Sequence, residues 1–330
     1  MEQFRYELKD KKSWHIGIML QSMNSAVAGR VLADIADKDE RIHVLTADLA
    51  FSNGTIAFAR RHPDRFYNIG IAEQNMVSIA AGLASCGDIP YVGTFASFLG
   101  LLCCEQIRTD LAYPNMPVRL LSHHAGISMG YYGTSHHATE DIGIMRSIAN
   151  VKIISPADGY STEMALRQTV DTEGPIYFRL GRGRDPEVYA PGESWEFGKL
   201  KILREGSDAT IFSTGIMTAA SVEAADALKE RGINVTVADV HTIVPLDKEG
   251  ILNLIEASDH IFVAEEHNTY SGLASIIADA LVDEGIGNKR INRIGFPSDE
   301  YSLIAAPYHL YTHYGLDAEG VAKRVRETLR

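Results

Sequence analysis

Apolar runs alternate with helical segments along most of this chain, and this alternation limits the possible folds more than any other feature. The helical segments carry apolar residues on one face, beginning with residues 25–37. In the first half of the chain the expected strands are residues 42–46, 65–69, 90–94, 118–122, 151–155 and 175–179. Strands that alternate with helices form a mostly parallel sheet with helices on both faces. The sequence therefore predicts an α/β fold.

The alternation stops between Gly181 and Gly198, where prolines, glycines and charged residues are typical of a linker. A chain of 330 residues is long enough for two domains. We place the boundary near Pro191, so that the domains comprise residues 1–190 and 191–330. The elements expected in the second domain are strands at 209–213, 235–240, 261–264 and 291–294 and helices at 219–231, 247–257, 273–284 and 318–329. No group of residues in this smaller α/β unit indicates a site.

The charge, the first residues and the cysteines exclude several classes of protein. A net charge of −12 without a basic stripe argues against nucleic-acid binding. Residues 1–10 carry acids where a signal peptide needs a cationic start, and the apolar runs are too short to span a bilayer. We therefore expect a cytoplasmic protein without a membrane partner. The three cysteines form no C-x-x-C pair, so neither a disulfide framework nor a zinc site is expected.

Candidate functional residues follow the predicted strands. Those at or just past a strand end are Asp48, Glu73, Phe95, His123, His124 and Arg182. Ligands bind outside the carboxyl ends of the strands in such sheets. One cleft is therefore expected to gather these side chains.

Glu73 lies where a short strand and a glycine corner lead into an apolar helix. A carboxylate at a helix start is favoured by the free N–H groups and needs no further role. Phe95 and Phe98 also have two interpretations, because two phenylalanines after a strand either pack in a core or form a wall for a flat ring. Asp48 and Ser52 lie in a segment that equally suits a helix cap.

Four histidines, His123, His124, His136 and His137, lie within fifteen residues of one another. They form two His-His pairs in glycine-rich loops, without a cysteine or a carboxylate cluster. This spacing differs from that of zinc sites, so no metal is expected on these side chains.

The run Phe-Tyr-Asn-Ile-Gly-Ile-Ala-Glu-Gln-Asn-Met at residues 66–76, followed by Thr-Phe-Ala-Ser-Phe at 94–98, resembles the cofactor-activating segment of the transketolase family. These enzymes use thiamine diphosphate. The resemblance implies that Glu73 bonds N1′ of the aminopyrimidine ring and favours its imino tautomer, which removes the C2 proton. It also implies that Phe95 and Phe98 contact this ring, with Phe98 as the direct contact.

The same resemblance implies roles for the other candidates. Asp48 matches an aspartate near the cofactor, and Ser52 matches a serine that contacts the substrate phosphate. One of His123 and His124 corresponds to a residue that contacts phosphate or sugar. His136 corresponds to a histidine near the reacting carbonyl. Arg182 matches an arginine that grips the sugar phosphate, a task suited to a guanidinium group.

The chain departs from the family at Tyr131 and Tyr132. Transketolases usually carry an acidic pair here, and its aspartate reads a substrate hydroxyl. Tyr132 in that place predicts a change in the accepted substrate, because buried polar groups dominate such discrimination. Ordinary pentose phosphates are therefore not expected, and branched or sulfonated ketoses are worth testing.

The resemblance covers only the second half of a transketolase, comprising the pyrimidine-binding and C-terminal domains. The Gly-Asp-Gly segment and asparagine pair that hold Mg²⁺ and the diphosphate are not found here. We therefore expect a split enzyme in which a separate N-terminal transketolase subunit supplies the metal and diphosphate sites, in an α2β2 assembly. Its predicted reaction transfers a two-carbon ketol unit from a ketose to an aldehyde. The alternatives are a β subunit of a 2-oxoacid dehydrogenase and a non-catalytic interaction protein that retains the fold.

Overall fold

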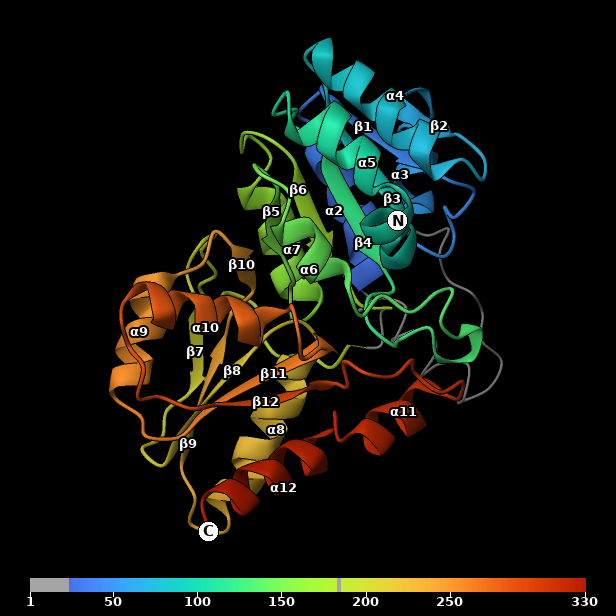
Figure 1. Cartoon of the computed structure of the whole chain (residues 1–330). Coiled ribbons are helices and arrows are strands. Elements are labelled where there is room, and N and C mark those ends of the chain that lie inside the picture. Colours follow the sequence, from blue (N-terminus) through green and yellow to red (C-terminus); the bar gives the residue numbers. More distant parts are fainter. Residues whose placement is uncertain (1–23, 183–184) are drawn as a thin grey trace.

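The computed structural model describes residues 24–182 and 185–330, which form two sheets with helices on both faces (Figure 1). The seven-stranded sheet has the order β10-β5-β6-β4-β3-β1-β2. Its strands are β1 (Ile42–Thr46), β2 (Phe66–Asn68), β3 (Ile89–Phe95), β4 (Arg119–His123), β5 (Lys152–Ile154), β6 (Ile176–Arg179) and β10 (Thr242–Val244). Strands β1 to β6 are parallel to their neighbours, and β10 is antiparallel to β5.

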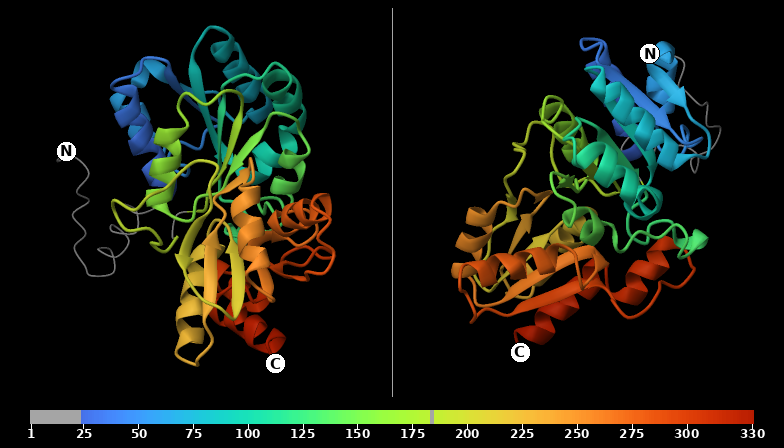
Figure 2. Two further views of the ribbon diagram at one scale, coloured as in Figure 1. Left: turned by 90° about the vertical axis from the view of Figure 1, so that its left-hand side faces the viewer. Right: turned by 45° about the horizontal axis from the view of Figure 1, so that its top comes forward.

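Two groups of helices cover the first sheet, because their apolar faces pack on opposite sides of its buried strands (Figure 2). The helices on one side are α2 (Asn24–Ala36) and α7 (Gly159–Gln168). The elements on the other side are α4 (Glu73–Ser85), α6 (Asp141–Arg146) and the helical segment 98–112. The short α3 (Ile56–Arg61) packs on α2.

The five-stranded sheet has the order β12-β11-β8-β9-β7. Its strands are β7 (Lys201–Arg204), β8 (Ala209–Ser213), β9 (Val235–Asp239), β11 (Ile261–Asn268) and β12 (Ile291–Phe296). One face is covered by α8 (Met217–Lys229), α11 (Pro307–Tyr314) and α12 (Ala318–Thr328). The other face is covered by α9 (Lys248–Glu256) and α10 (Leu273–Asp283).

The predicted fold class is confirmed, since both sheets are mostly parallel and carry helices on both faces. Three elements were not predicted, namely β7, β10 and α11. β10 follows β9 in the chain yet pairs with β5, so the two halves share a sheet. The boundary near Pro191 stays a prediction.

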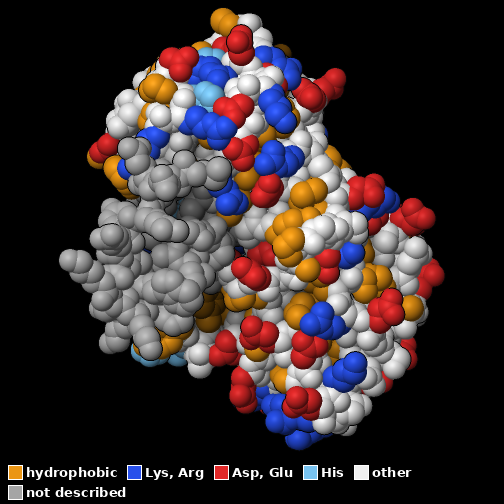
Figure 3. Space-filling model, turned by 180° about the vertical axis from the view of Figure 1, so that it is seen from behind, with side chains coloured by type: hydrophobic (Ala, Val, Ile, Leu, Met, Phe, Trp, Pro, Cys, Tyr) orange, Lys and Arg blue, Asp and Glu red, His pale blue; other side chains and the backbone are white. Residues whose placement is uncertain are grey.

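The described surface carries charges of both signs. On the face drawn in Figure 3, basic and acidic side chains are interspersed, and the described residues form no continuous basic area there. Within residues 24–182 and 185–330, no helix is both long and apolar enough to cross a membrane. The expectation about a signal peptide concerns residues 1–10, which lie outside the described part.

Candidate active site

Glu73 is the first residue of α4, and Gly70, at φ +80°, turns the chain between β2 and this helix. Its side chain is only 6% exposed, among apolar helix residues such as Met76 and Val77. Among the described residues the carboxylate has no hydrogen bond or ion pair. Burial, with the Glu73 charge as a smaller cause, raises the pKa of the neighbouring Cys103 thiol to about 12. A carboxylate with unused acceptor oxygens therefore lies at this helix start.

Aromatic rings gather just past the end of β3. Phe95 ends this strand, and its ring centroid lies 5.6 Å from that of Phe98, 4.6 Å from that of His124 and 5.7 Å from that of His136. The His136 ring also lies 5.4 Å from Phe98 and 5.0 Å from Tyr132. Phe98 opens a π-helical turn, Phe98–Leu102, a local irregularity that is frequent at functional sites. The five rings form one aromatic cluster.

Burial keeps the histidines of this region neutral. His123 ends β4, and neither of its buried ring nitrogens has a hydrogen-bond partner among the described residues. Burial lowers the pKa of His123 to about 3, and burial and the Arg182 charge lower that of His124 to about 3. Burial also lowers the pKa of His136. At neutral pH these rings are therefore uncharged, and each has one nitrogen able to donate and one able to accept a hydrogen bond from a ligand.

The remaining predicted residues lie around this cluster. The Arg182 guanidinium is close enough to influence His124 and donates to the Ser128 carbonyl at 3.5 Å. The Asp48 carboxylate follows β1 and accepts from the Asn68 amide at 3.1 Å. Ser52 is exposed in the turn after β1. No ring contact or hydrogen bond joins Asp48 or Ser52 to the described aromatic cluster, although all lie at the carboxyl edge of the first sheet.

Two helices near this region begin at acidic residues. Asp158 caps α7, because its Oδ1 accepts the Ser161 N–H at 2.8 Å. The segment 139–141 leads into α6, whose first residue is Asp141.

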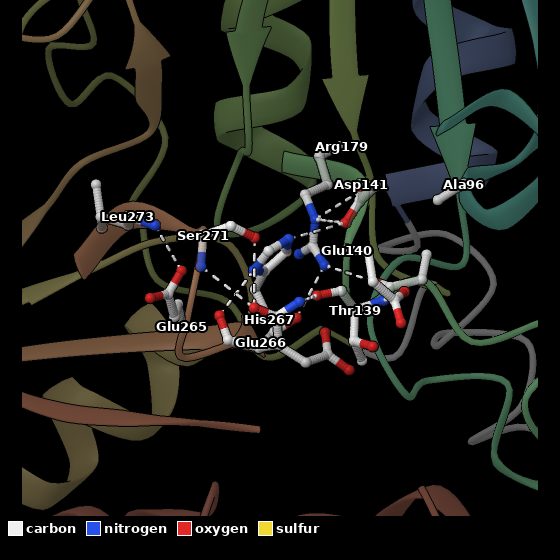
Figure 4. Close-up of polar contacts among 12 residues, drawn as sticks. Ala96, Thr139, Glu140, Asp141, Arg179, Glu265, Glu266, His267, Ser271 and Leu273 are labelled. Atoms are coloured by element: carbon white, nitrogen blue, oxygen red, sulfur yellow. Dashed lines mark hydrogen bonds and ion pairs between the residues drawn. The ribbon is translucent and has the colours of Figure 1, made fainter. Parts of the chain in front are cut away.

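A buried polar cluster joins the two halves of the chain, and it was not predicted from the sequence (Figure 4). The Arg179 guanidinium on β6 pairs with the Asp141 carboxylate at 2.9 Å, and their side chains are 3% and 0% exposed. Arg179 also donates to the carbonyl oxygens of Ala138 at 3.1 Å and Glu266 on β11 at 2.8 Å. The Tyr177 hydroxyl donates to Asp141 at 3.0 Å.

The β11 end of this cluster consists of Glu265, Glu266 and His267, all buried. Glu266 Oε1 accepts from the Ile127 N–H at 2.9 Å and from the Tyr311 hydroxyl at 2.6 Å. Burial raises the pKa of Glu265 and of Glu266 to about 7. The sequence signal for this cluster was the run Glu265, Glu266 and His267, which directly follows the apolar residues 261–264 of β11.

Comparison with protein families supplies the identity of the fold. Residues 21–186 match the model described as "Transketolase, pyrimidine binding domain", and residues 198–321 match "Transketolase, C-terminal domain". The chain belongs to the transketolase family. This family uses thiamine diphosphate, and the Glu73 carboxylate has acceptor oxygens that no described residue bonds and that could take a hydrogen bond from a ring of such a group.

Two curated relatives cover nearly the same length. The chain is 38% identical to a putative transketolase C-terminal section of Methanocaldococcus jannaschii, covering 92% of this chain and 95% of the relative. It is 32% identical to a 6-deoxy-6-sulfo-D-fructose transketolase subunit of Clostridium sp. (strain MSTE9), covering 90% and 91% respectively.

A solved structure titled "Split gene transketolase, inactive beta4 tetramer" superposes with a TM-score of 0.85 at 36% identity. The superposition covers 93% of this chain and 98% of the solved chain.

Residues 24–182 and 185–330 contain no group of three or more His, Cys, Asp or Glu residues arranged to hold a metal ion.

Proposed function

We propose that this chain is the C-terminal subunit of a heteromeric, thiamine diphosphate-dependent transketolase, which transfers a two-carbon ketol unit from a ketose to an aldehyde. The observation that carries the proposal is Glu73, a carboxylate without a described hydrogen bond or ion pair at the start of α4, the helix that packs against the turn Phe98–Leu102. The matches to transketolase C-terminal sections and subunits support it. They favour this reaction over the 2-oxoacid dehydrogenase and non-catalytic alternatives.

The residues of the site have distinct parts in this reaction. When bound, thiamine diphosphate supplies a thiazolium carbon that carries the ketol unit between substrates. Glu73 would hold a proton against N1′ of the pyrimidine, and Phe98 would lie against the ring. The neutral His136 would hydrogen-bond the reacting carbonyl. Arg182 would bind the anionic end of the substrate, since a guanidinium pairs well with phosphate.

We place the other half of the cofactor site on a partner, the N-terminal transketolase subunit, which holds Mg²⁺ and the diphosphate in an α2β2 assembly. The Glu73 end of the molecule exposes large apolar side chains, namely Phe51 (78%), Ile71 (84%), Leu101 (44%) and Leu102 (50%). The Gln74 amide donates to the Leu102 carbonyl at 3.2 Å, which keeps this segment beside the start of α4. Exposed apolar side chains in one region are typical of an interface.

The substrate is proposed to differ from the common pentose phosphates. Tyr132 is 59% exposed and lies over His136, where it borders the proposed reacting carbonyl. A phenol in this place is a weaker hydrogen-bond acceptor than a carboxylate. The name of the Clostridium relative refers to a sulfonated ketose, so sulfonated and branched ketoses are the first donors to test.

Calorimetry with reconstituted protein tests the proposal. Thiamine diphosphate and Mg²⁺ are titrated into this chain alone, into the candidate N-terminal subunit alone and into their mixture, with thiamine as the control that lacks the diphosphate. We expect tight binding only in the mixture, together with ketol transfer in a panel of donors and aldehydes. Equal binding by the separate chain, or a mixture without transfer from any ketose, would overturn the proposal.

A further inference from the structure

The second sheet has a cavity of its own, of about 520 Å³, beside its edge strand β12 and helix α12. Its walls include Thr269, just past the end of β11, and Gly295 and Pro297 at the end of β12. These two strands are parallel, so the cavity lies at carboxyl ends of strands, where open α/β sheets bind ligands. None of the lining residues was assigned to the proposed cofactor or substrate site.

Cations concentrate around this cavity although the chain has a net charge of −12. The lining contains Arg293, Lys323 and Arg324 and one carboxylate, Glu327. Lys323 and Glu327 lie 4.0 Å apart, both largely exposed, so that this pair is weak. Two positive charges thus remain in excess.

The three cations differ in how far other groups already bind them. Arg293 donates to the Thr269 carbonyl and to the Ser275 hydroxyl, which holds its guanidinium in place. The side chain of Arg324 has no hydrogen bond or ion pair with any described residue. An ordered guanidinium next to an unpaired one and a lysine is an arrangement that suits phosphate groups.

We propose that this cavity binds a small metabolite that carries a diphosphate group, such as a nucleoside diphosphate. The excess of two cations matches the charge of such a group, and the volume accommodates a molecule of that size. The ligand lies against the β12 and α12 residues of the second sheet, away from Glu73. It is therefore a second ligand of this subunit, independent of the ketol transfer proposed above.

Calorimetry of this chain alone tests the site, with ADP, pyrophosphate and adenosine as titrants. We expect ADP and pyrophosphate to bind, and the double variant Lys323→Ala/Arg324→Ala to bind each at least about tenfold more weakly, because charged hydrogen bonds are lost. The matched control is Arg30→Ala/Lys38→Ala, which removes two exposed cations from the first half of the chain. Binding by this control is expected to equal that of the wild type.

Three results would overturn the proposal. They are the absence of binding by both ADP and pyrophosphate, binding of adenosine as tight as that of ADP, and a Lys323→Ala/Arg324→Ala variant that binds as the wild type does. Thiamine diphosphate also carries a diphosphate group, so it is titrated as well, and any binding of it to this chain alone should be lost in Lys323→Ala/Arg324→Ala. Because this variant leaves Glu73 unchanged, binding in this cavity is distinguished from binding at the cofactor site of the proposed function.

Discussion

At the scale of single residues, the position of the Glu73 carboxylate at the start of α4 needs a physical explanation. A helix N-terminus stabilises a carboxylate by typically 0.3–1 kcal/mol, and up to about 2 kcal/mol when it is partly buried. Glu73 is 6% exposed and has no described partner. Helix stabilisation therefore accounts for a carboxylate at this position, and its unused acceptor oxygens are the feature that leaves room for a bound ligand.

We predict that Glu73→Gln lowers ketol transfer by the reconstituted enzyme at least about 100-fold, because general acid–base contributions reach this size. The thermal midpoint should stay nearly unchanged, since the variant keeps the shape of the side chain and breaks no described hydrogen bond or ion pair. Steady-state transfer assays and thermal denaturation measure the two effects. Glu105→Gln, at an exposed acid paired with Arg108, is the control and should retain activity. Full activity of Glu73→Gln would remove the residue from the mechanism.

At the scale of elements, the end of β11 holds the two sheets together. Arg179 from β6 donates to the Glu266 carbonyl, and Tyr311 from α11 donates to the Glu266 carboxylate. Breaking a buried ion pair by removing one partner costs about 3–5 kcal/mol, because an uncompensated charge remains. The contact between the Arg179 and Asp141 side chains is therefore costly to lose, and it fixes α6 against β6.

The Glu266 carboxyl makes the stability of this contact depend on pH. Its pKa is raised by burial from 4.5 to about 7, so between these values the folded chain binds a proton that the unfolded chain has released. This stabilisation is complete below pH 4.5 and is lost as the pH rises through 7, by on the order of 1.4 kcal/mol per pH unit.

Glu266→Gln lacks this titration. We therefore predict that the thermal midpoint of Glu266→Gln, minus that of the wild type, increases as the pH is raised from 5 to 7.5. Differential scanning calorimetry over this range measures the difference. Glu205→Gln, at an exposed position, is the matched control, and its thermal midpoint should differ from that of the wild type by the same amount at every pH. A constant difference for Glu266→Gln would show that Glu266 does not titrate in this window.

At the scale of the whole molecule, the exposed apolar residues around Glu73 indicate that this end of the chain functions inside an assembly. A solved relative at 36% identity is described as an inactive beta4 tetramer, which is a statement about that protein. Fully burying one large apolar side chain contributes about 1.5–3 kcal/mol. Two such residues therefore contribute a large part of an interface.

We predict that Ile71→Glu/Leu102→Glu weakens association with the N-terminal subunit at least about 100-fold, because two apolar contacts are replaced by charges that must be desolvated. Analytical ultracentrifugation of the mixed subunits measures this effect. Tyr270→Glu, which places a charge at an equally exposed aromatic residue of the second half, should associate normally. If the double variant assembles as the wild type does, the interface lies elsewhere.

Sequence patterns were sufficient for the fold class because strand and helix periodicity is local. They also indicated that Phe95 and His124 belong together, since parallel strands place their carboxyl ends at one edge. His136 was placed near the reacting carbonyl only by the family resemblance, and its ring lies beside Phe95. Helix α11 was missed because it has eight residues, of which only Leu310 is buried, so its apolar periodicity is weak.

Tertiary structure alone decided the features that depend on distant residues. The three-residue strand β10 has no recognisable pattern of its own, and its place beside β5 results from packing. The pairing of Arg179 with Asp141 and Glu266 likewise needs residues from both halves of the chain. The sequence by itself determined most of the segments that become strands and helices, with β7, β10 and α11 as exceptions, and which residue types follow them. Which buried charges meet, and which remain unpaired, was decided by the packing of the two sheets, because desolvation and pairing depend on neighbours that are remote in the chain.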